Sequence, residues 1–285
     1  MYPAAIAGFS LIWYDSFTRY TTDPSSAPYK QWDGIKVEPN AGTGEIQFYD
    51  TTEDLTYVLS YPPSMPGNNE DQLFILPQHK DGRWTSTRLE GKAAHGCPEG
   101  KSLILQAELR AGNASSDKQG GVWPAFWALG ESRNDGVEWP LCGEWDIFEA
   151  SDGHDWSLAS LHWGVKNDAG EIEKHDAPSG NTNDRQHKFD HTQFHTWALK
   201  VDRTNSNWKD QTIQWLMDGE KFDEVKGSDA GTEKEWLLLA DQAYYPVLNV
   251  AIGTNFPGHG TVSESTSTGL DTGMVVNYVA FYVSD

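Results

Sequence analysis

The sequence predicts an all-β sandwich, and three observations lead to that fold class. Short runs rich in β-branched and aromatic residues recur along the chain. Pro, Gly, Asn or Asp bound most of these runs and supply turn signals. Long helical periods are absent, as are internal repeats and linkers that would divide the chain. Many short strands without alternating helices favour packed antiparallel sheets, so we expect residues 1–285 to form a single domain.

The first half of the chain contains six runs that we interpret as strands. Polar, Pro/Gly-rich sequence separates them, and a longer stretch of that composition, ending at residue 44, predicts an ordered surface loop. The predicted strands cover residues 11–17, 45–49, 56–60, 72–76, 84–89 and 103–109.

The second half continues the same rhythm. The predicted strands cover residues 157–163, 194–201, 212–217, 246–252 and 277–283. The polar run 166–193 has no apolar period, so we interpret it as a long loop, a kind of segment that is usually functional or disordered. One short helix, over residues 233–245, is expected within a connection.

Composition excludes several classes of partner. The chain carries 42 acidic against 21 basic residues, a formal net charge of −21. Nucleic acids and anionic membranes require Lys/Arg patches, so neither is an expected partner, whereas a neutral polymer is compatible with this charge. The 13 Trp, 11 Tyr and 11 Phe exceed what a core usually needs and offer flat surfaces on which sugar rings can stack.

The stretch GEWDIFE, residues 143–149, interleaves three carboxylates with large apolar residues that favour a strand. Because side chains alternate along a strand, Glu144 and Asp146 share one face. Strict alternation would put Glu149 on the other face, and only one extra residue, a β-bulge, returns it to theirs. Three acids on one face raise one another's pKa, which favours a functional site. Solvated acids on an exposed strand edge are the alternative interpretation.

Carboxylates paired on one face suit the cleavage of a glycosidic bond. A retaining enzyme needs a nucleophile and an acid/base about 5 to 5.5 Å apart, and a bulge bends the strand so that the side chains lean together. The nucleophile must be ionised while the general acid keeps its proton. On this interpretation Glu144 attacks the anomeric carbon, Glu149 protonates the leaving oxygen and later activates water, and Asp146 tunes and orients both.

The spacing Glu144-x-Asp146-x-x-Glu149 resembles the bulged active-site strand of glycoside hydrolase family 16, in its laminarinase-like branch. Further blocks follow in the family's order, so that the resemblance covers residues 84–283. These blocks are TSTRL at 85–89, GVWPAFWAL at 121–129, LHWG at 161–164, FHTWAL at 194–199, MDG at 217–219 and LNVAIG at 248–253.

The resemblance implies a β-jelly roll of two antiparallel sheets with a concave glycan-binding cleft. It also implies that Glu144 is the nucleophile, Glu149 the acid/base and Asp146 the assisting acid. Trp123 and Trp127 match the family's cleft tryptophans, where an indole stacks on a sugar face. Ordinary core packing is the alternative interpretation of both tryptophans.

Five further substrate-binding candidates follow from the same comparison. His162 matches a position beside the acid/base, and Arg88 lies on the family's arginine-bearing strand. A satisfied core histidine and an arginine paired with buried acids are the respective alternatives. Where the family often has a tryptophan after a Gly-Asn pair, this chain has Phe256 after Asn255, so we expect a donor-side pocket of altered shape. An insertion that contains Trp139 is expected to rim the cleft, as is the run 166–193.

We expect no cofactor and no metal. Family members often bind a structural calcium ion on the convex sheet through an acid in the final strand, where this chain has Asn277. An uncharged amide oxygen binds calcium more weakly than a carboxylate. A metal-binding module built from the three acids with Asp152 and His154 is disfavoured, because a strand provides no compact loop to wrap a cation.

Together these observations predict a retaining endo-β-1,3-glucanase of the laminarinase type, with mixed 1,3/1,4-linked glucan as a further substrate. A β-1,3-galactan hydrolase, a glucan transglycosylase and a non-catalytic lectin-like module stay open, because subsite shape decides between them. We expect a secreted monomer whose partner is a β-glucan polysaccharide. The sequon Asn113-Ala114-Ser115 fits secretion, and Cys97 and Cys142 are compatible with either a disulfide or two thiols.

Overall fold

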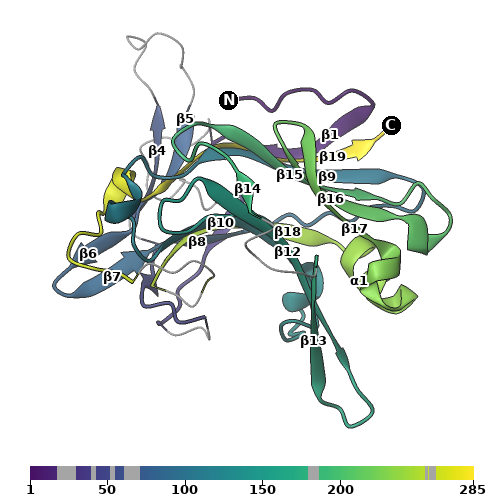
Figure 1. The fold of residues 1–285 in the computed structure, drawn as a ribbon. Coiled ribbons are helices and arrows are strands. Elements are labelled where there is room, and N and C mark those ends of the chain that lie inside the picture. Colours follow the sequence, from purple (N-terminus) through teal and green to yellow (C-terminus); the bar gives the residue numbers. More distant parts are fainter. Residues whose placement is uncertain are drawn as a thin grey trace.

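A computed structural model describes residues 1–17, 30–39, 43–51, 55–60, 71–178, 186–253, 256 and 261–285. In this part of the chain two large antiparallel sheets pack on each other, and a small third sheet lies at one end (Figure 1). The predicted all-β sandwich is therefore confirmed.

The first large sheet contains both the N-terminal and the C-terminal strand. Its order is β17 (Glu220–Lys226), β16 (Thr212–Met217), β15 (His195–Asp202), β9 (Ser102–Arg110), β19 (Met274–Ser284), β5 (Asp71–Ile75) and β4 (Thr56–Ser60), with β1 (Phe9–Asp15) also paired to β19.

The second large sheet carries the acidic strand at its centre. Its order is β13 (Ile172–Ala177), β12 (Trp156–Lys166), β11 (Glu144–Glu149), β10 (Val122–Gly130), β18 (Tyr244–Ile252), β8 (Arg88–Gly91) and β2 (Trp32–Gly34), with β14 (His187–Lys188) also paired to β12.

The remaining elements are short. The small sheet consists of β3 (Phe48–Tyr49), β7 (Arg83–Ser86) and β6 (Gln78–Lys80). The α-helix α1 covers Glu233–Ala240, and the 3₁₀ turns are η1 (Ser116–Lys118), η2 (Glu131–Arg133), η4 (Trp208–Asp210), η5 (Gly227–Ala230) and η6 (Gly269–Asp271). No helix in the described ranges has the length and apolar character needed to cross a membrane.

The two large sheets share one hydrophobic core. Alternate residues of β9, from Leu103 to Leu109, enter it from one sheet, and Phe126 of β10 enters it from the other. Trp145 of β11 is fully buried there, with its ring centroid 3.7 Å from that of Tyr244. Its indole N–H donates to the Leu239 carbonyl at 3.0 Å. This contact attaches α1 to the strand that carries the acids.

Where the structure describes the run 166–193, at 166–178 and 186–193, it contains β13 and β14, so the predicted long loop is wrong there. Strands β12 and β13 form a hairpin that projects from the body of the protein (Figure 1). Asn167 closes its turn, because the side-chain oxygen accepts hydrogen bonds from the backbone N–H groups of Ala169 and Glu171, both at 3.0 Å. The prediction failed because a projecting hairpin meets solvent on much of its surface, so β13 carries few apolar residues.

Other boundaries also differ from the predictions. The helix ends at Ala240, not at 245, because β18 already begins at Tyr244. The run 84–89 forms two strands separated by Thr87: β7 pairs within the small sheet, and β8 pairs with β18 and β2. Strands β2, β6 and β17 were not predicted, and β2 lies inside the stretch predicted as a surface loop.

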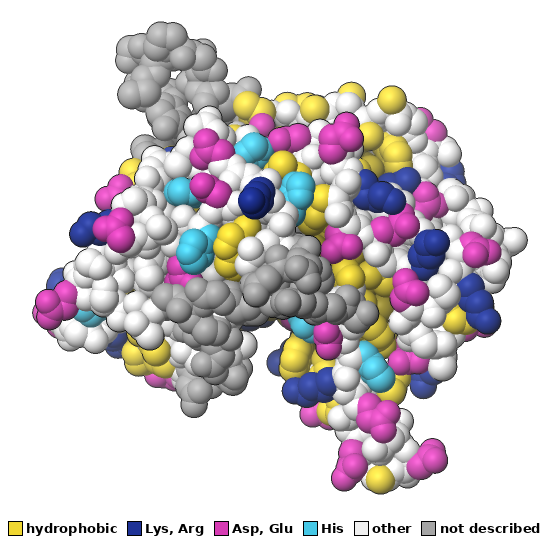
Figure 2. Space-filling model, viewed as in Figure 1, with side chains coloured by type: hydrophobic (Ala, Val, Ile, Leu, Met, Phe, Trp, Pro, Cys, Tyr) yellow, Lys and Arg dark blue, Asp and Glu magenta, His cyan; other side chains and the backbone are white. Residues whose placement is uncertain are grey.

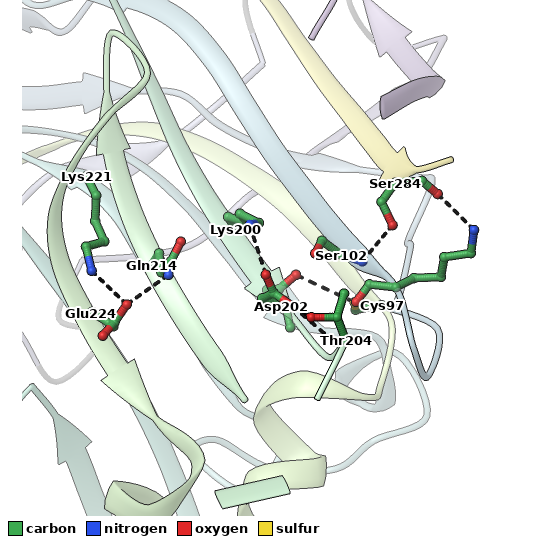
Figure 3. A network of polar contacts seen from close by, with 11 residues as sticks. Cys97, Ser102, Lys200, Asp202, Thr204, Gln214, Lys221, Glu224 and Ser284 are labelled. Carbon is green, nitrogen blue, oxygen red and sulfur yellow. Dashed lines mark hydrogen bonds and ion pairs between the residues drawn. The ribbon is translucent and has the colours of Figure 1, made fainter. Parts of the chain in front are cut away.

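Cys97 and Cys142 are buried free thiols, so the disulfide alternative is wrong. Burial raises the pKa of Cys97 to about 12 and that of Cys142 to about 11, which keeps both as unreactive thiols. Figure 3 shows the polar contacts around Cys97. Among them, the Ser102 backbone N–H donates to Ser284 Oγ at 3.0 Å, so the end of β19 is attached to the start of β9.

Candidate active site

The central acidic strand, β11, contains the bulge that its sequence predicts. Its pairing with β12 shifts register between Asp146 and Glu149, and its pairing with β10 shifts at the same place. Ile147 and Phe148 are consecutive, yet both are fully buried in the core. One extra residue therefore separates the acids, and Glu149 returns to the face of Glu144 and Asp146.

Two backbone groups at the bulge have partners outside the regular strand pairing. The indole N–H of Trp215, from the opposite sheet, donates to the Asp146 carbonyl at 2.7 Å. The backbone N–H of Glu149 donates to Oγ of the fully buried Ser157 at 3.0 Å. Because buried backbone groups without partners are costly, these contacts stabilise the irregular strand.

Asp146 and Glu149 are buried and Glu144 is half-buried, and this burial raises the pKa of each acid. Asp146 is 4% exposed and Glu149 is 7% exposed. Burial, and then the charge of Asp146, raises the pKa of Glu144 to about 8. Burial raises the pKa of Asp146 to about 8 as well. Burial followed by the charges of Asp146 and Glu144 raises the pKa of Glu149 well above its ordinary value. All three shifts favour the protonated carboxyl over the carboxylate.

Two basic side chains oppose this effect. His162 lies opposite Glu144 on β12, and its Nε2 is 3.2 Å from Asp146 Oδ2. Its side chain is 34% exposed, so the interpretation as a buried core histidine is wrong. His162 lowers the pKa of both Glu144 and Glu149 relative to the effect of burial, and Arg88 also lowers that of Glu144.

The spacing of the site also permits a cation. Glu144, Asp146 and His162 each offer one ligand atom, and these atoms lie within 4.8 Å of one another. The alternative module that includes Asp152 is not formed, because Asp152 Oδ1 instead accepts a hydrogen bond from the Gly121 backbone N–H at 2.7 Å. A cation held by Glu144, Asp146 and His162 would compete with a proton for the oxygens of Asp146.

Asn277, at the family's calcium position, has both ends of its amide bound by the protein. Its Oδ1 accepts from Gln72 Nε2 at 2.6 Å, and its Nδ2 donates to Glu108 Oε2 at 2.9 Å. These hydrogen bonds orient the amide by direct contacts between β5, β19 and β9.

Trp123 and Trp127 lie on the face of β10 that matches the acid-bearing face of β11. Trp127 is directly opposite Asp146, and both tryptophans are half-buried and outside the main core. The Trp127 indole N–H donates to Asn249 Oδ1 at 2.6 Å, and the Trp123 ring stacks on Phe256 with centroids 4.6 Å apart. Neither tryptophan packs in the main core, which is against the alternative interpretation of ordinary core packing, whereas Trp127 does pack against a small secondary cluster of buried residues.

Comparison with known proteins agrees with this geometry. No family model matches the chain. The solved structure of an endo-1,3-β-glucanase from Streptomyces sioyaensis aligns over 100% of both chains, with a TM-score of 0.79 and 27% identity. Glucan endo-1,3-β-glucosidase A1 of Niallia circulans is 25% identical over 98% of this chain. The chain is similar to laminarinase-like proteins of glycoside hydrolase family 16.

The laminarinase from Rhodothermus marinus shares the same fold, with a TM-score of 0.66 and 22% identity over 96% of this chain and 97% of its own. The expected β-jelly roll is thereby confirmed. The chain spans only 38% of the length of the Niallia protein, so it corresponds to a part of that relative.

Arg88 already has partners on the protein. Its Nε and Nη2 donate to Glu90 Oε1 at 2.9 and 2.6 Å, and its guanidinium carbon lies 4.6 Å from the Trp127 ring centroid. These contacts agree with the alternative interpretation of Arg88 as an arginine paired with an acid. Contact with substrate stays a prediction.

A chain of hydrogen bonds that sequence analysis missed supports Trp127. Asn249, which accepts from the indole, donates through Nδ2 to the Tyr49 hydroxyl at 3.1 Å, and Tyr49 donates to Glu45 Oε2 at 3.0 Å. Gln47 donates to the same oxygen at 2.6 Å. Burial raises the pKa of Tyr49 well above its ordinary value, so its hydroxyl stays protonated. Alternation within the predicted strand 45–49 indicates that Glu45, Gln47 and Tyr49 share one face. It gives no indication that this face contacts Asn249.

Aromatic residues extend from Trp123 toward the edge of β12. Phe256 stacks on Trp123, Trp156 lies beyond it at 6.4 Å between centroids, and His154 stacks on Trp156 at 5.6 Å. Trp156 and His154 were not predicted as parts of a binding surface, because nothing local links them to β10. Asn255 lies outside the described residues.

The opposite side of the acids is formed by Trp139 and the β12–β13 hairpin. Trp139 is 41% exposed, and its ring centroid lies 6.3 Å from that of His162. Lys174 of β13 places Nζ 4.6 Å from the Trp139 ring centroid. Figure 2 shows this hairpin projecting at the lower right, with a notch in the surface beside it.

Proposed function

We propose that this chain is a retaining endo-β-1,3-glucanase of the laminarinase type, which hydrolyses β-glucan by double displacement. The observation that carries the proposal is the bulged strand β11, which presents three carboxyls on one face beside two half-buried tryptophans. The named activities of the Streptomyces and Niallia relatives support β-1,3-linked glucan as the substrate.

The carboxyls take the roles that a retaining mechanism requires. Glu144 attacks the anomeric carbon, so that a bond from C1 to its oxygen forms while the glycosidic C1–O bond breaks. Glu149 gives its proton to the departing oxygen. In the second step Glu149 takes a proton from water, the water oxygen bonds to C1, and the ester bond to Glu144 breaks. Two inversions at the same carbon leave its configuration unchanged.

The electrostatics of the site support this division of roles. The charges of both neighbouring acids raise the pKa of Glu149, whereas only that of Asp146 raises the pKa of Glu144. His162, Arg88 and the Trp139 indole lower the pKa of Glu144 against the effect of burial. Both carboxyls have raised pKa values, but the neighbouring charges oppose ionisation of Glu149 more than that of Glu144, which is the order that an acid and a nucleophile need.

The glycan contacts proposed here use the side chains that surround the acids. Stacking on indole suits the CH-rich faces of glucose, and the cationic groups suit its hydroxyls. The proposed contact residues are Trp123, Trp127, Arg88, His162, Phe256, Asn255 and Trp139.

We also infer a single catalytic domain that acts outside the cell as a monomer. Both large sheets contribute to one hydrophobic core, which supports one folding unit. A polymeric substrate and the sequon at Asn113 support secretion. Size-exclusion chromatography coupled to light scattering should give a mass near 31.8 kDa, and a dimer mass would contradict the monomer.

The proposal is tested by incubating the protein with laminarin, lichenan, xyloglucan, agarose and β-1,3-galactan and following oligosaccharide release. We expect oligosaccharides of intermediate length from laminarin, with the β-anomer formed first. Release from galactan alone would show that the substrate is galactan and not glucan. Transfer products without hydrolysis would indicate a transglycosylase. Binding without any release would indicate a lectin-like module and refute the enzyme.

A further inference from the structure

A corner formed by residues 138–140 is held against the projecting β12–β13 hairpin. Pro140 packs on Gly164 of β12 so closely that a Cβ built at Gly164 would lie 3.0 Å from Pro140 Cγ. A larger residue at that position would crowd the ring, so glycine allows the close approach. Lys166 Nζ lies 3.9 Å from Glu138 Oε1 at the same junction. The corner thus has a defined position beside the acidic strand, although it is a connection between elements.

This corner presents Trp139 toward the acids. Hydrogen bonding from the Trp139 indole lowers the pKa of Glu144 against the effect of burial, which brings the ring next to that carboxyl. Trp139 nevertheless remains 41% exposed. Lys174 supplies an ammonium over the ring, and His162 lies beside it. An exposed indole with nearby hydrogen-bond donors is the composition of a sugar subsite.

The two sides of β11 are thereby both equipped to hold a sugar. Trp123 and Trp127 lie toward β10, and Trp139 lies toward β12 and β13. Cleavage within a polymer requires a sugar on each side of the scissile bond. The glycosyl unit bound to Glu144 has to be held throughout the reaction, which suits the more buried β10 side. The exposed side then receives the departing sugar.

We propose that the Trp139–Pro140 corner and Lys174 form the subsite for the sugar on the leaving-group side, and that this subsite determines how often a sugar replaces water in the second step. The inference rests on the proposed function. In transfer, the acceptor hydroxyl gives its proton to Glu149, its oxygen bonds to C1, and the C1–O bond to Glu144 breaks. Hydrolysis differs only in that water supplies the oxygen and the proton. A bound acceptor raises the share of transfer.

The test uses laminaribiosyl β-fluoride as donor, because its leaving group is one atom and needs no sugar subsite. Fluoride release is measured without acceptor, and the ratio of transfer to hydrolysis is measured with added laminaribiose, each variant at its own pH optimum. For Trp139→Ala we expect this ratio to fall about tenfold, as the loss of one stacking surface implies. Fluoride release should fall by a smaller factor, because the donor reaction has no departing sugar to hold. Trp139→Phe should recover part of the ratio.

Lys174→Ala should lower the ratio about threefold, since it removes one hydrogen-bond donor and leaves the ring in place. Lys209→Ala is the matched control, because Lys209 also places its ammonium over an indole, 5.6 Å from the Trp208 ring centroid, but on η4. The control should leave both measurements unchanged.

Two results would overturn the inference while leaving the proposed function intact. An unchanged ratio in Trp139→Ala would show that the corner does not hold the acceptor. A fall in fluoride release as large as the fall in transfer would place Trp139 on the donor side. A native protein that releases no fluoride and cleaves no glucan would instead refute the proposed function, and this inference with it.

Discussion

The two sides of the acidic strand differ in how their side chains are held. Toward β10, Trp127 is fixed by a chain of hydrogen bonds that runs through Asn249 and Tyr49 to Glu45. Toward β12, Trp139 has an ammonium over its ring and remains 41% exposed. The first side consists of strands and satisfied buried groups, and the second of a corner and a projecting hairpin.

This difference matters for a reaction in two steps. Every donor in the chain from Trp127 has one acceptor, and the last acceptor is the Glu45 carboxylate, so the orientation of each group is determined. Such a network positions the unit that stays bound to the enzyme. A partly exposed ring with one cationic neighbour is better suited to a sugar that must leave or be replaced by water.

The largest effect is expected at the strand between the two sides. Glu149→Gln removes the proton donor but leaves both flanking surfaces in place, so laminarin turnover should fall by about 10²- to 10⁴-fold while glycan binding persists. Azide needs no general base, so it should restore turnover of an activated donor by attacking the glycosyl-enzyme. Normal turnover in this variant, measured by reducing-sugar release, would mean that Glu149 is not the acid/base.

A smaller effect is expected from the buried network. Tyr49→Phe removes the hydroxyl that joins Asn249 to Glu45, so the amide loses its acceptor and Trp127 loses its fixed orientation. We expect kcat/KM for laminaribiosyl β-fluoride to fall about tenfold, as the loss of a buried hydrogen-bond partner implies. The transfer ratio should stay unchanged.

The two sides can be separated by the response to Tyr49→Phe and Trp139→Ala. The first should alter donor kinetics alone, and the second acceptor kinetics alone. If both variants change the same quantity, the division between a donor side and an acceptor side does not hold.

The smallest effect concerns pH. His162 on the hairpin side and Arg88 on the network side both lower the pKa of Glu144, and His162 contributes more. Removing either group should raise that pKa further, so the nucleophile ionises only at higher pH. The acidic limb of kcat/KM should therefore move to higher pH in His162→Ala and, by less, in Arg88→Met. A limb that moves to lower pH in either variant would contradict the assignment of Glu144.

Local sequence determined the features that depend on local geometry. The bulge could be predicted because side chains alternate along a strand, which would put Glu149 on the apolar core face. One extra residue before Glu149 returns it to the face of the other two acids. Strands 56–60 and 212–217 matched the structure for the same reason, since their periods and flanking turn residues lie within a few positions. The family resemblance then supplied the roles of the acids, which spacing alone left open.

Only the tertiary structure decided which distant side chains meet. Asn249 and Tyr49 are 200 positions apart, and their contact depends on the order of strands around β10. The contact of Lys174 with the Trp139 ring could not be predicted either, because β13 has too few apolar residues for its strand period to be detected. Cys97 and Cys142 illustrate the limit again: their number permits a disulfide, but the structure buries each as a free thiol. Pairing between sheets follows from global packing, and no local period encodes it.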